Sequence, residues 1–276
     1  MISHSIVYDA DERNRAIYSS GIKDFLRGVR LAELWLAMGW HDIRQRYSRS
    51  VMGPFWVSIS LGVFVIGLGL TYGALFRAPV RDYVPYVTVG MVVWTMIAAM
   101  VNEGCMTFIS AASIVKQMPA PASVHALRVV WRSLIIFAHN AAVIVLMLLV
   151  LRVNPGWAAL LAIPGLAVLL LNGVGFCVTL GILATRFRDV TPLVGNLIQM
   201  LLFVTPVLWR ASDLGDRGAI ALANPFFHLI ELVRSPLLGA APTLFSWQIA
   251  LIFTALNLCA ALFLYAHFRW RIPYWI

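Results

Sequence analysis

The chain alternates long apolar runs with short polar segments, and the apolar runs have the length of membrane crossings. The first run, from Pro54 to Phe76, contains no ionisable side chain. A helix rises about 1.5 Å per residue and the hydrocarbon core of a bilayer is about 30 Å thick, so about 20 apolar residues make one crossing. Because a helix in lipid satisfies its own backbone polar groups, we expect an all-α integral membrane protein. Six spans are predicted: residues 54–76, 86–110, 131–151, 157–185, 192–209 and 246–265.

The polar segments between these spans predict the orientation. An even number of spans places both termini on one side, and the segments on that side hold 15 of the 21 basic residues. Lys and Arg are enriched in cytoplasmic loops, so we expect both termini in the cytoplasm. The chain then divides into a cytosolic N-terminal region, residues 1–53, and a six-span transmembrane domain, residues 54–276.

The N-terminal region carries an amphipathic helical pattern. Its apolar positions form two stripes, the second on a shifted face: Ile22, Phe25, Leu26 and Val29, and then Leu34, Trp35 and Met38. Such a helix lies along a membrane surface or packs as a small helix on the cytosolic side, and the pattern leaves both open.

The segment between the fifth and sixth spans predicts a helix too short to cross. Asn224 is a good helix cap, Pro225 is a good first helical residue, and Pro236 limits the helix to about three turns. Three polar residues form one stripe along it: His228, Glu231 and Arg234. We expect an interfacial or re-entrant helix over about residues 225–238 at the outer face. A degenerate seventh span would break the even number that the charges favour.

Composition excludes several classes of protein. Hydrophobic residues make up 61% of the chain and charged residues 12%, against about 25% charged residues in soluble domains. The net charge is +9, but the basic residues are spread between apolar runs, which indicates topology and anionic lipid rather than nucleic acid. The chain has no GxSxG, HExxH or paired acidic motif, and its six histidines are scattered, so we expect no catalytic or metal site.

Nucleotide binding can be judged from the lysines. A P-loop needs a Gly-Lys step, whereas Lys23 and Lys116 follow Ile and Val. We therefore expect no cofactor in this chain, and if ATP and magnesium are used, they belong to a separate subunit.

Glu103 is the only acidic residue well within a predicted span. A charge at mid-bilayer costs about 3 kcal/mol by insertion scales, so this side chain should face protein or water. Asn102, His139 and Asn140 are candidate partners. The carboxyl either carries protons in an ion-coupled carrier or pins helices together.

Two spans carry small, polar and aromatic residues at helical spacing. They are Trp56, Ser60, Phe64, Gly67 and Thr71 on the first span, and Asn196, Gln199 and Phe203 on the fifth. Polar groups are unfavourable against lipid, so these stripes should face a protein interior or a conduit, although ordinary helix packing also explains them. Trp131, Trp157, Trp209 and Trp247 lie at span ends and fit an interfacial aromatic belt. Trp56 and Trp94 are less easily explained in this way, and aromatic faces can stack on sugar rings.

Four stretches, found in one order, carry a family resemblance: WHDIRQRYSRSVMGPFW (40–56), ATRFRDVTPLV (184–194), NPFFHLIELVRSPLLG (224–239) and RWRIPYWI (269–276). Over about residues 30–276 the chain resembles the membrane subunit of bacterial ATP-binding-cassette polysaccharide exporters, the permeases for O-antigen, capsule and teichoic acid. The resemblance implies a homodimer in the inner membrane, paired with two copies of a nucleotide-binding subunit that holds ATP and magnesium. It implies that a lipid-linked polysaccharide is moved and that this subunit is not an enzyme.

The resemblance also implies roles for individual residues. A conduit between the subunits would be lined by Trp56, Ser60, Phe64, Gly67, Thr71 and Phe203. Contacts that couple the permease to the ATPase would come from Arg44, Arg46, Lys116, Arg186, Arg188 and Asp189. An outer gate would be formed by Asn224, Pro225, His228, Glu231 and Arg234. An ATP-driven exporter of drugs or lipids shares this architecture, and an ion-coupled carrier that uses Glu103 is a more distant alternative.

Overall fold

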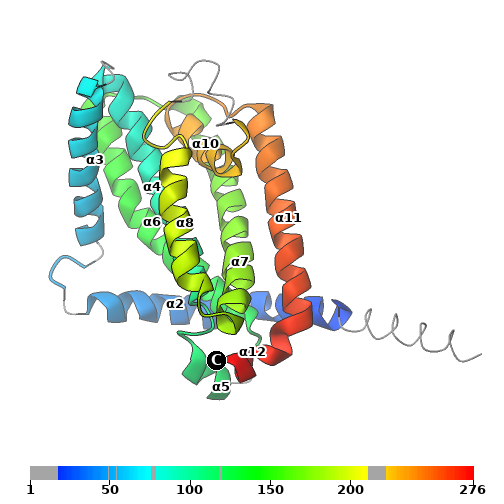
Figure 1. Cartoon of the computed structure of the whole chain (residues 1–276). Helices are drawn as coiled ribbons and strands as arrows, with labels where there is room; N and C mark the ends of the chain where they lie inside the picture. The colour runs from blue at the N-terminus through cyan, green and yellow to red at the C-terminus, as the bar shows by residue number, and fades with distance from the viewer. Residues whose placement is uncertain (1–17, 49, 54, 76–78, 118–119, 211–221) are drawn as a thin grey trace, which may run out of the picture.

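The computed structural model describes residues 18–48, 50–53, 55–75, 79–117, 120–210 and 222–276. Every regular element within these residues is helical. Six helices run along one bundle (Figure 1): α3 (Phe55–Leu75), α4 (Val80–Cys105), α6 (Ser123–Leu151), α7 (Ala162–Arg186), α8 (Val190–Val204) and α11 (Leu244–Phe268).

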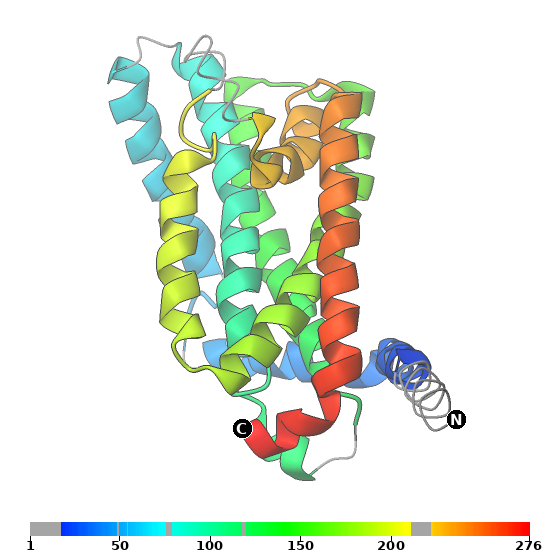
Figure 2. The same ribbon diagram turned by 45° about the vertical axis from the view of Figure 1, so that its right-hand side comes forward.

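Shorter helices close the two ends of the bundle. Helix α2 (Ala32–Tyr47) lies across one end, and α10 (Pro225–Leu237) lies at the opposite end (Figures 1 and 2). The C-terminal helix α12 (Ile272–Trp275) and α5 (Ala112–Gln117) lie at the α2 end. The first and last described residues therefore share one end of the molecule, and its assignment to the cytoplasm remains a prediction.

Four helical segments are long and apolar enough to cross a membrane. They are Val80–Cys105, Ser123–Leu151, Gly156–Arg186, which includes the 3-10 turn η1 (Gly156–Leu161), and Leu244–Trp275, which includes η3 (Arg269–Arg271). Among the described residues, the apolar parts of α3 (Phe55–Gly69) and α8 are shorter. The structure confirms an all-helical protein with four candidate spans, and the count of six remains a prediction.

Several helix ends differ from the predicted ones. Helix α8 ends five residues early, because Thr205 adopts an extended conformation before Pro206. Helix α6 begins eight residues early, because Arg128 and Arg132 near its start have ion-pair partners and need not lie outside the helix. Helix α4 ends at Cys105, five residues early, which places Glu103 in the last turn.

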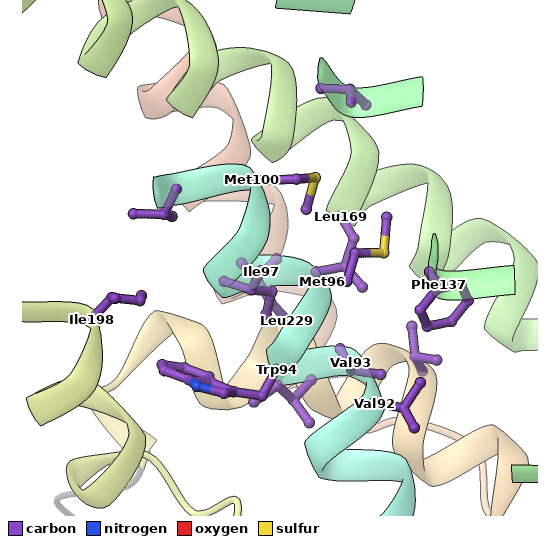
Figure 3. Close-up of a cluster of buried hydrophobic side chains, with 14 of the residues drawn as sticks. Val92, Val93, Trp94, Met96, Ile97, Met100, Phe137, Leu169, Ile198 and Leu229 are labelled. Carbon is purple, nitrogen blue, oxygen red and sulfur yellow. The ribbon is translucent and has the colours of Figure 1, made fainter. Parts of the chain in front are cut away.

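Helix α4 forms the centre of the bundle. It packs against α3, α6, α7, α8 and α10, and apolar side chains on all its faces are buried. A helix that is hydrophobic all round is expected at such a place. Figure 3 shows the cluster of buried side chains around it, which includes Val92, Val93, Trp94, Met96, Ile97, Met100, Phe137, Leu169, Ile198 and Leu229.

Small residues on α7 allow its neighbours to approach closely. A Cβ added at Gly165 would lie 2.3 Å from the backbone oxygen of Leu232 on α10, which no side chain could accommodate. The same helix is joined to α11 by polar groups, since the Asn172 side-chain amide donates to the Thr254 hydroxyl at 2.6 Å and the Asn257 amide donates to the Asn172 backbone oxygen at 3.0 Å. Close approach and buried hydrogen bonds of this kind hold helices together in a lipid environment.

The N-terminal region contains two described helices rather than one. Residues 18–30 are helical, and Leu31, with φ −79° and ψ 50°, separates them from α2. This break explains why the apolar stripe of the sequence shifts to another face after Val29. The first helix packs through Gly28 against Ser123 at the start of α6, whereas Ile22 and Leu26 remain 43% and 46% exposed.

Candidate functional site

The mixed stripe of α3 lies on the outside of the bundle. Trp56 and Phe64 are 60% and 49% exposed, and Ser60, Gly67 and Thr71 are exposed as well. The opposite face of α3, which includes Leu61 and Val65, is buried against α4 and α6. The stripe is therefore not used for packing within one subunit. Its role in a conduit remains a prediction.

Helix α8 presents a similar face. Phe203 is 65% exposed, and Asn196 and Gln199 are exposed on the same side, while Ile198 is buried against the bundle. Both α3 and α8 pack on α4, so each has its second side free. Trp94 differs from Trp56, because it is buried and its ring meets Phe226 edge-on at 6.2 Å. Trp94 belongs to the core and is not available to a substrate.

Five charged side chains from α2, α4 and α6 form one ion-pair cluster. Asp42 on α2 accepts from Arg128 Nε at 2.7 Å and from Arg132 at 2.7 Å, both on α6. Glu103 on α4 accepts from Arg132 Nη2 at 2.6 Å and from Arg46 on α2 at 3.0 Å. The order Arg128–Asp42–Arg132–Glu103–Arg46 joins the helix across the end of the bundle to two of its long helices.

Two of the candidate partners predicted for Glu103, His139 and Asn140, are engaged elsewhere. The Asn140 side chain accepts from Ser58 at 2.9 Å, and His139 Nδ1 lies 2.8 Å from the Ile135 backbone oxygen. The reason is that α4 ends at Cys105, so Glu103 lies in its last turn beside the arginines of α6 rather than at mid-span. Of the two roles that the sequence left open for this carboxylate, its engagement by two arginines supports the pinning of helices.

The geometry of the cluster keeps the Asp42 carboxyl ionised. Burial by itself would raise the pKa of the Asp42 carboxyl, but the hydrogen bonds and positive charges of Arg128 and Arg132 outweigh this effect and hold the pKa below its ordinary value. Asp42 therefore remains ionised at neutral pH and keeps both arginines satisfied.

The residues predicted to couple to an ATPase lie at the α2 end (Figure 1). Arg44 and Arg188 are exposed, and Asp189 is the residue before the first turn of α8. The Arg186 guanidinium lies 5.7 Å from the Trp275 ring centroid. The remaining two are engaged within the subunit: Arg46 pairs with Glu103, and Lys116 donates to the Ile276 backbone oxygen at 2.7 Å. The structure brings these elements to one end of the bundle, and their coupling role remains a prediction.

The predicted short helix before the last span is present as α10. The Asn224 side chain accepts from the Phe226 backbone N–H at 3.0 Å, and Pro225 is the first helical residue. Unlike a simple interfacial helix, α10 is buried on several faces, between α4, α7 and α11. Its polar stripe faces protein: His228 is fully buried, and its two ring nitrogens lie 3.0 Å from the Ser246 hydroxyl and 2.9 Å from the Leu222 backbone oxygen.

Arg234 on α10 is the largest fully buried side chain. Its Nε donates to Glu231 at 2.9 Å and Nη1 donates to the Pro206 backbone oxygen at 2.8 Å. The guanidinium also lies 3.7 Å from the ring centroid of Tyr86, a geometry for cation–π attraction.

Two tyrosines near the start of α4 complete this arrangement, and the sequence analysis missed them. The Tyr83 hydroxyl donates to the Leu208 backbone oxygen at 2.6 Å, and the Tyr86 hydroxyl lies 3.1 Å from the Pro206 oxygen and 3.2 Å from the Trp209 oxygen. They satisfy backbone carbonyl groups of the non-helical segment that follows α8. Two tyrosines three residues apart in an otherwise apolar helix were the available signal.

The fold and these faces define a class of protein. An all-helical bundle with a buried central helix and four helices long and apolar enough to cross a bilayer is typical of a multi-pass membrane protein. Residues 33–238 match the family model described as ABC-2 type transporter, and the chain belongs to this family. It is a transport subunit of the inner membrane, as the resemblance noted from the sequence implies.

Curated relatives agree with the family. The chain is 26% identical over 191 residues to an O-antigen export system permease protein RfbA of Klebsiella pneumoniae, an alignment that covers 68% of this chain and 74% of the relative. It is 21% identical over 202 residues to the O-antigen export system permease protein RfbA of Myxococcus xanthus, which covers 73% of this chain and 78% of the relative.

Proposed function

We propose that the chain is the permease subunit of an ATP-driven exporter that moves a lipid-linked polysaccharide, such as O-antigen or capsule, across the inner membrane. The observation that carries the proposal is the pair of outward mixed faces on α3 and α8 in a chain whose curated relatives are O-antigen permeases. A hydroxyl-rich polymer needs a path with weak, repeated contacts, which aromatic and small polar side chains provide.

The conduit in this proposal lies between two copies of the chain. Trp56, Ser60, Phe64 and Phe203 lie on the outside of one bundle, so a second copy is required to enclose them. Aromatic rings flanked by small polar residues can stack on the apolar faces of sugar rings and still let the polymer slide. Homodimers with two-fold symmetry are the commonest oligomers, which agrees with this arrangement.

A separate ATPase, in two copies, would supply ATP, magnesium and motion. In this proposal it docks at the α2 end, where the exposed Arg44, Arg188 and Asp189 offer charged contacts. A displacement of α2 would pass to α4 and α6 through Asp42 and Glu103, because these two carboxylates join the three helices. Helix α10 at the opposite end would act as the outer gate, although its burial indicates that it moves together with α4 and α8.

The test of the conduit is glycan export. A strain that lacks its own permease would be supplied with this chain and its ATPase, and surface polysaccharide would be measured on immunoblots. Trp56→Ala with Phe203→Ala should reduce export several-fold, whereas Leu256→Ala on the exposed face of α11 should have no effect. Equal export by all variants, at equal membrane levels, would exclude these residues from the path.

A second experiment tests the dimer. In a chain whose three natural cysteines, including the exposed Cys259 on α11, are replaced by serine, Ser60→Cys and Thr71→Cys should each form disulfide-linked dimers in membranes on mild oxidation if the α3 faces of two copies meet. A cysteine at Leu256 is the control. Cross-linking at Leu256 alone would place the dimer contact at α11 and remove the proposed conduit.

A further inference from the structure

A cavity of about 170 Å³ lies between α3, α4 and α6. Its walls are mostly apolar, and none of the described lining residues is charged. Leu61 and Phe137 are buried in these walls, whereas Val57 at the edge is 38% exposed and marks the open side. Three polar side chains also line the cavity, one from α4 and two from α6: Thr95, Ser133 and Asn140. An ion would lose its hydration here without a counter-charge, so the cavity suits an uncharged molecule.

Asn140 is the polar side chain of the cavity whose hydrogen bonding is incomplete. It is 2% exposed, and its Oδ1 accepts from the Ser58 hydroxyl at 2.9 Å. Within the described part of the chain, nothing accepts a hydrogen bond from its Nδ2. A buried amide donor without an acceptor is unfavourable, and such groups normally meet a water or a ligand. The occupant of the cavity therefore has to supply an acceptor.

Thr95 and Ser133 offer the opposite capacity. The Thr95 hydroxyl donates its proton to the Val92 backbone oxygen at 2.8 Å, and the Ser133 hydroxyl donates to the Val129 backbone oxygen at 3.0 Å. Each oxygen keeps lone pairs, so both residues line the cavity as acceptors. One amide donor and two hydroxyl acceptors together match a hydroxyl group, which accepts and donates at once.

The volume and the walls limit the size of the molecule. An apolar cavity of about 150 Å³ holds a single benzene ring, and this cavity is slightly larger. A sugar ring carries hydroxyl groups on most of its carbons, whereas only three of the described lining side chains are polar. The remaining hydroxyls would be buried without partners, which is unfavourable. An apolar ring with one hydroxyl therefore fits this cavity better than a sugar does.

The other hollow beside α3 has a different lining. It is a groove of about 270 Å³, also bounded by α4 and α6, and Thr88 is the one polar side chain among its described lining residues. The Thr88 hydroxyl donates to the Val84 backbone oxygen at 2.7 Å. The described lining of this groove thus offers no donor to the oxygen of a hydroxyl group. The groove serves as an internal comparison for the cavity.

We propose that the cavity binds a small uncharged ring compound with a single hydroxyl group, of the phenol or cyclohexanol class. The hydroxyl oxygen accepts from Asn140 Nδ2, and its proton is donated to the oxygen of Thr95 or Ser133. The ring lies against Leu61 and Phe137. Because α3 forms one wall, a bound ring contacts from its inner side the helix that carries the mixed face. The site does not depend on which substrate is exported.

The experiment measures saturable binding of two probes to the full-length permease. 4-Fluorophenol and fluorobenzene share a ring of one size and differ in the hydroxyl group. Each would be titrated by fluorine NMR into permease in phosphatidylcholine nanodiscs, with empty nanodiscs as the measure of partition into lipid. We expect 4-fluorophenol to bind about fivefold more tightly than fluorobenzene, because the hydroxyl completes the hydrogen bonds of the cavity.

One pair of variants tests the hydroxyl contact. Thr95→Val combined with Ser133→Ala removes both acceptors and changes the shape of the cavity little. It should lower the affinity for 4-fluorophenol about fivefold and leave that for fluorobenzene unchanged. Thr88→Val is the matched control, because Thr88 lies on the same helix, also donates within that helix, and lines the groove instead of the cavity.

A second pair tests the location. Ala99 lines the cavity, so Ala99→Leu should fill it and abolish saturable binding of both probes. Ala142→Leu makes the same change at an exposed position of α6 and should have no effect. The thermal unfolding midpoint of each variant without probe would show that the variant is folded.

Each outcome decides the proposal. Tighter binding of 4-fluorophenol that depends on Thr95 and Ser133 and is abolished by Ala99→Leu supports the site. Equal binding of the two probes overturns it, and so does binding that Ala99→Leu leaves unchanged, which would place the ring elsewhere. Absence of saturable binding also overturns it and leaves the cavity to water. Because no ATPase or glycan is present, none of these results bears on the export assay.

Discussion

The two ends of the bundle both depend on arginine, but they use it differently. At the α10 end, Arg234 is fully buried and contacts Glu231, a backbone oxygen and the ring of Tyr86. At the α2 end, three arginines share two carboxylates, and the outermost pair, Arg46 with Glu103, has side chains 45% and 24% exposed.

The two arrangements of arginines differ in how easily their ion pairs can be exchanged. A fully buried guanidinium cannot leave its partners without a large cost, so it fixes α10 to α4 and to the end of α8. At the α2 end only the Arg46–Glu103 pair is partly exposed, and it can exchange partners at low cost because water replaces what is lost. The Asp42, Arg128 and Arg132 side chains are only 10–19% exposed and hold α2 to α6. The α10 end is therefore held rigidly, whereas the outermost ion pair of the α2 end can exchange partners.

The largest expected effect is at the rigid end. Arg234→Ala would remove the positive charge that compensates Glu231 and one of the donors to the Pro206 carbonyl, and removing one member of a buried pair typically costs about 3–5 kcal/mol. The measurement is the thermal unfolding midpoint of the purified permease in detergent. Arg234→Lys keeps the positive charge but loses the paired donors of the guanidinium and its contact with the Tyr86 ring. Its unfolding midpoint should therefore lie between those of the natural chain and Arg234→Ala. A midpoint unchanged in Arg234→Ala would show that this end is held by apolar packing alone.

The second-largest expected loss of stability is at Asp42, in the ion-pair cluster of α2, α4 and α6. Asp42→Asn removes the carboxylate that two partly buried arginines share, and we expect a cost of about 2 kcal/mol in the free energy of unfolding. A double-mutant cycle with Arg128→Gln should give a coupling energy of about 1 kcal/mol. Strict additivity of the two substitutions would mean that the pair contributes nothing to joining α2 to α6.

The same carboxylate predicts a dependence on pH. Because its pKa is lowered in the folded protein, Asp42 contributes stability above the pKa of the unfolded chain, and this contribution is lost as the pH falls through the lower folded value. The difference in unfolding midpoint between the natural chain and Asp42→Asn should be constant from about pH 5 to pH 8 and should shrink below about pH 4. A difference that persists at low pH would assign the effect of the substitution to packing rather than to charge.

The sequence predicted features that depend on neighbours along the chain. Asn224 and Pro225 start α10 as their cap chemistry indicates, and helical spacing placed Trp56, Ser60 and Phe64 on one exposed face. The shifted stripe of the N-terminal region reflected the break at Leu31. In each case the signal lies within a few residues and follows from backbone geometry.

The parts that the sequence did not predict depend on distant pairings. Glu103 is 57 residues from Arg46 and 29 from Arg132, so its choice of partner follows from how helices pack and where α4 ends. Tyr83 and Tyr86 reach carbonyl groups about 120 residues away, which no local pattern reports. The sequence did not predict the burial of Arg234 for the same reason. A polar stripe on a short helix indicates an exposed face unless the helices that cover it are known.

The smallest expected effect completes the contrast between the two ends. Arg46→Gln removes an arginine whose side chain is nearly half exposed, and such pairs contribute less than about 1 kcal/mol. Raising the salt concentration from 0.05 M to 0.5 M should narrow the difference between this variant and the natural chain, because exposed charges are screened, while the deficit of Arg234→Ala should stay unchanged. Both variants would be followed by the same thermal unfolding assay. If Arg46→Gln destabilised the protein as strongly as Arg234→Ala, and without dependence on salt, the outermost ion pair of the α2 end would be held as firmly as Arg234, and the difference between the two ends would be wrong.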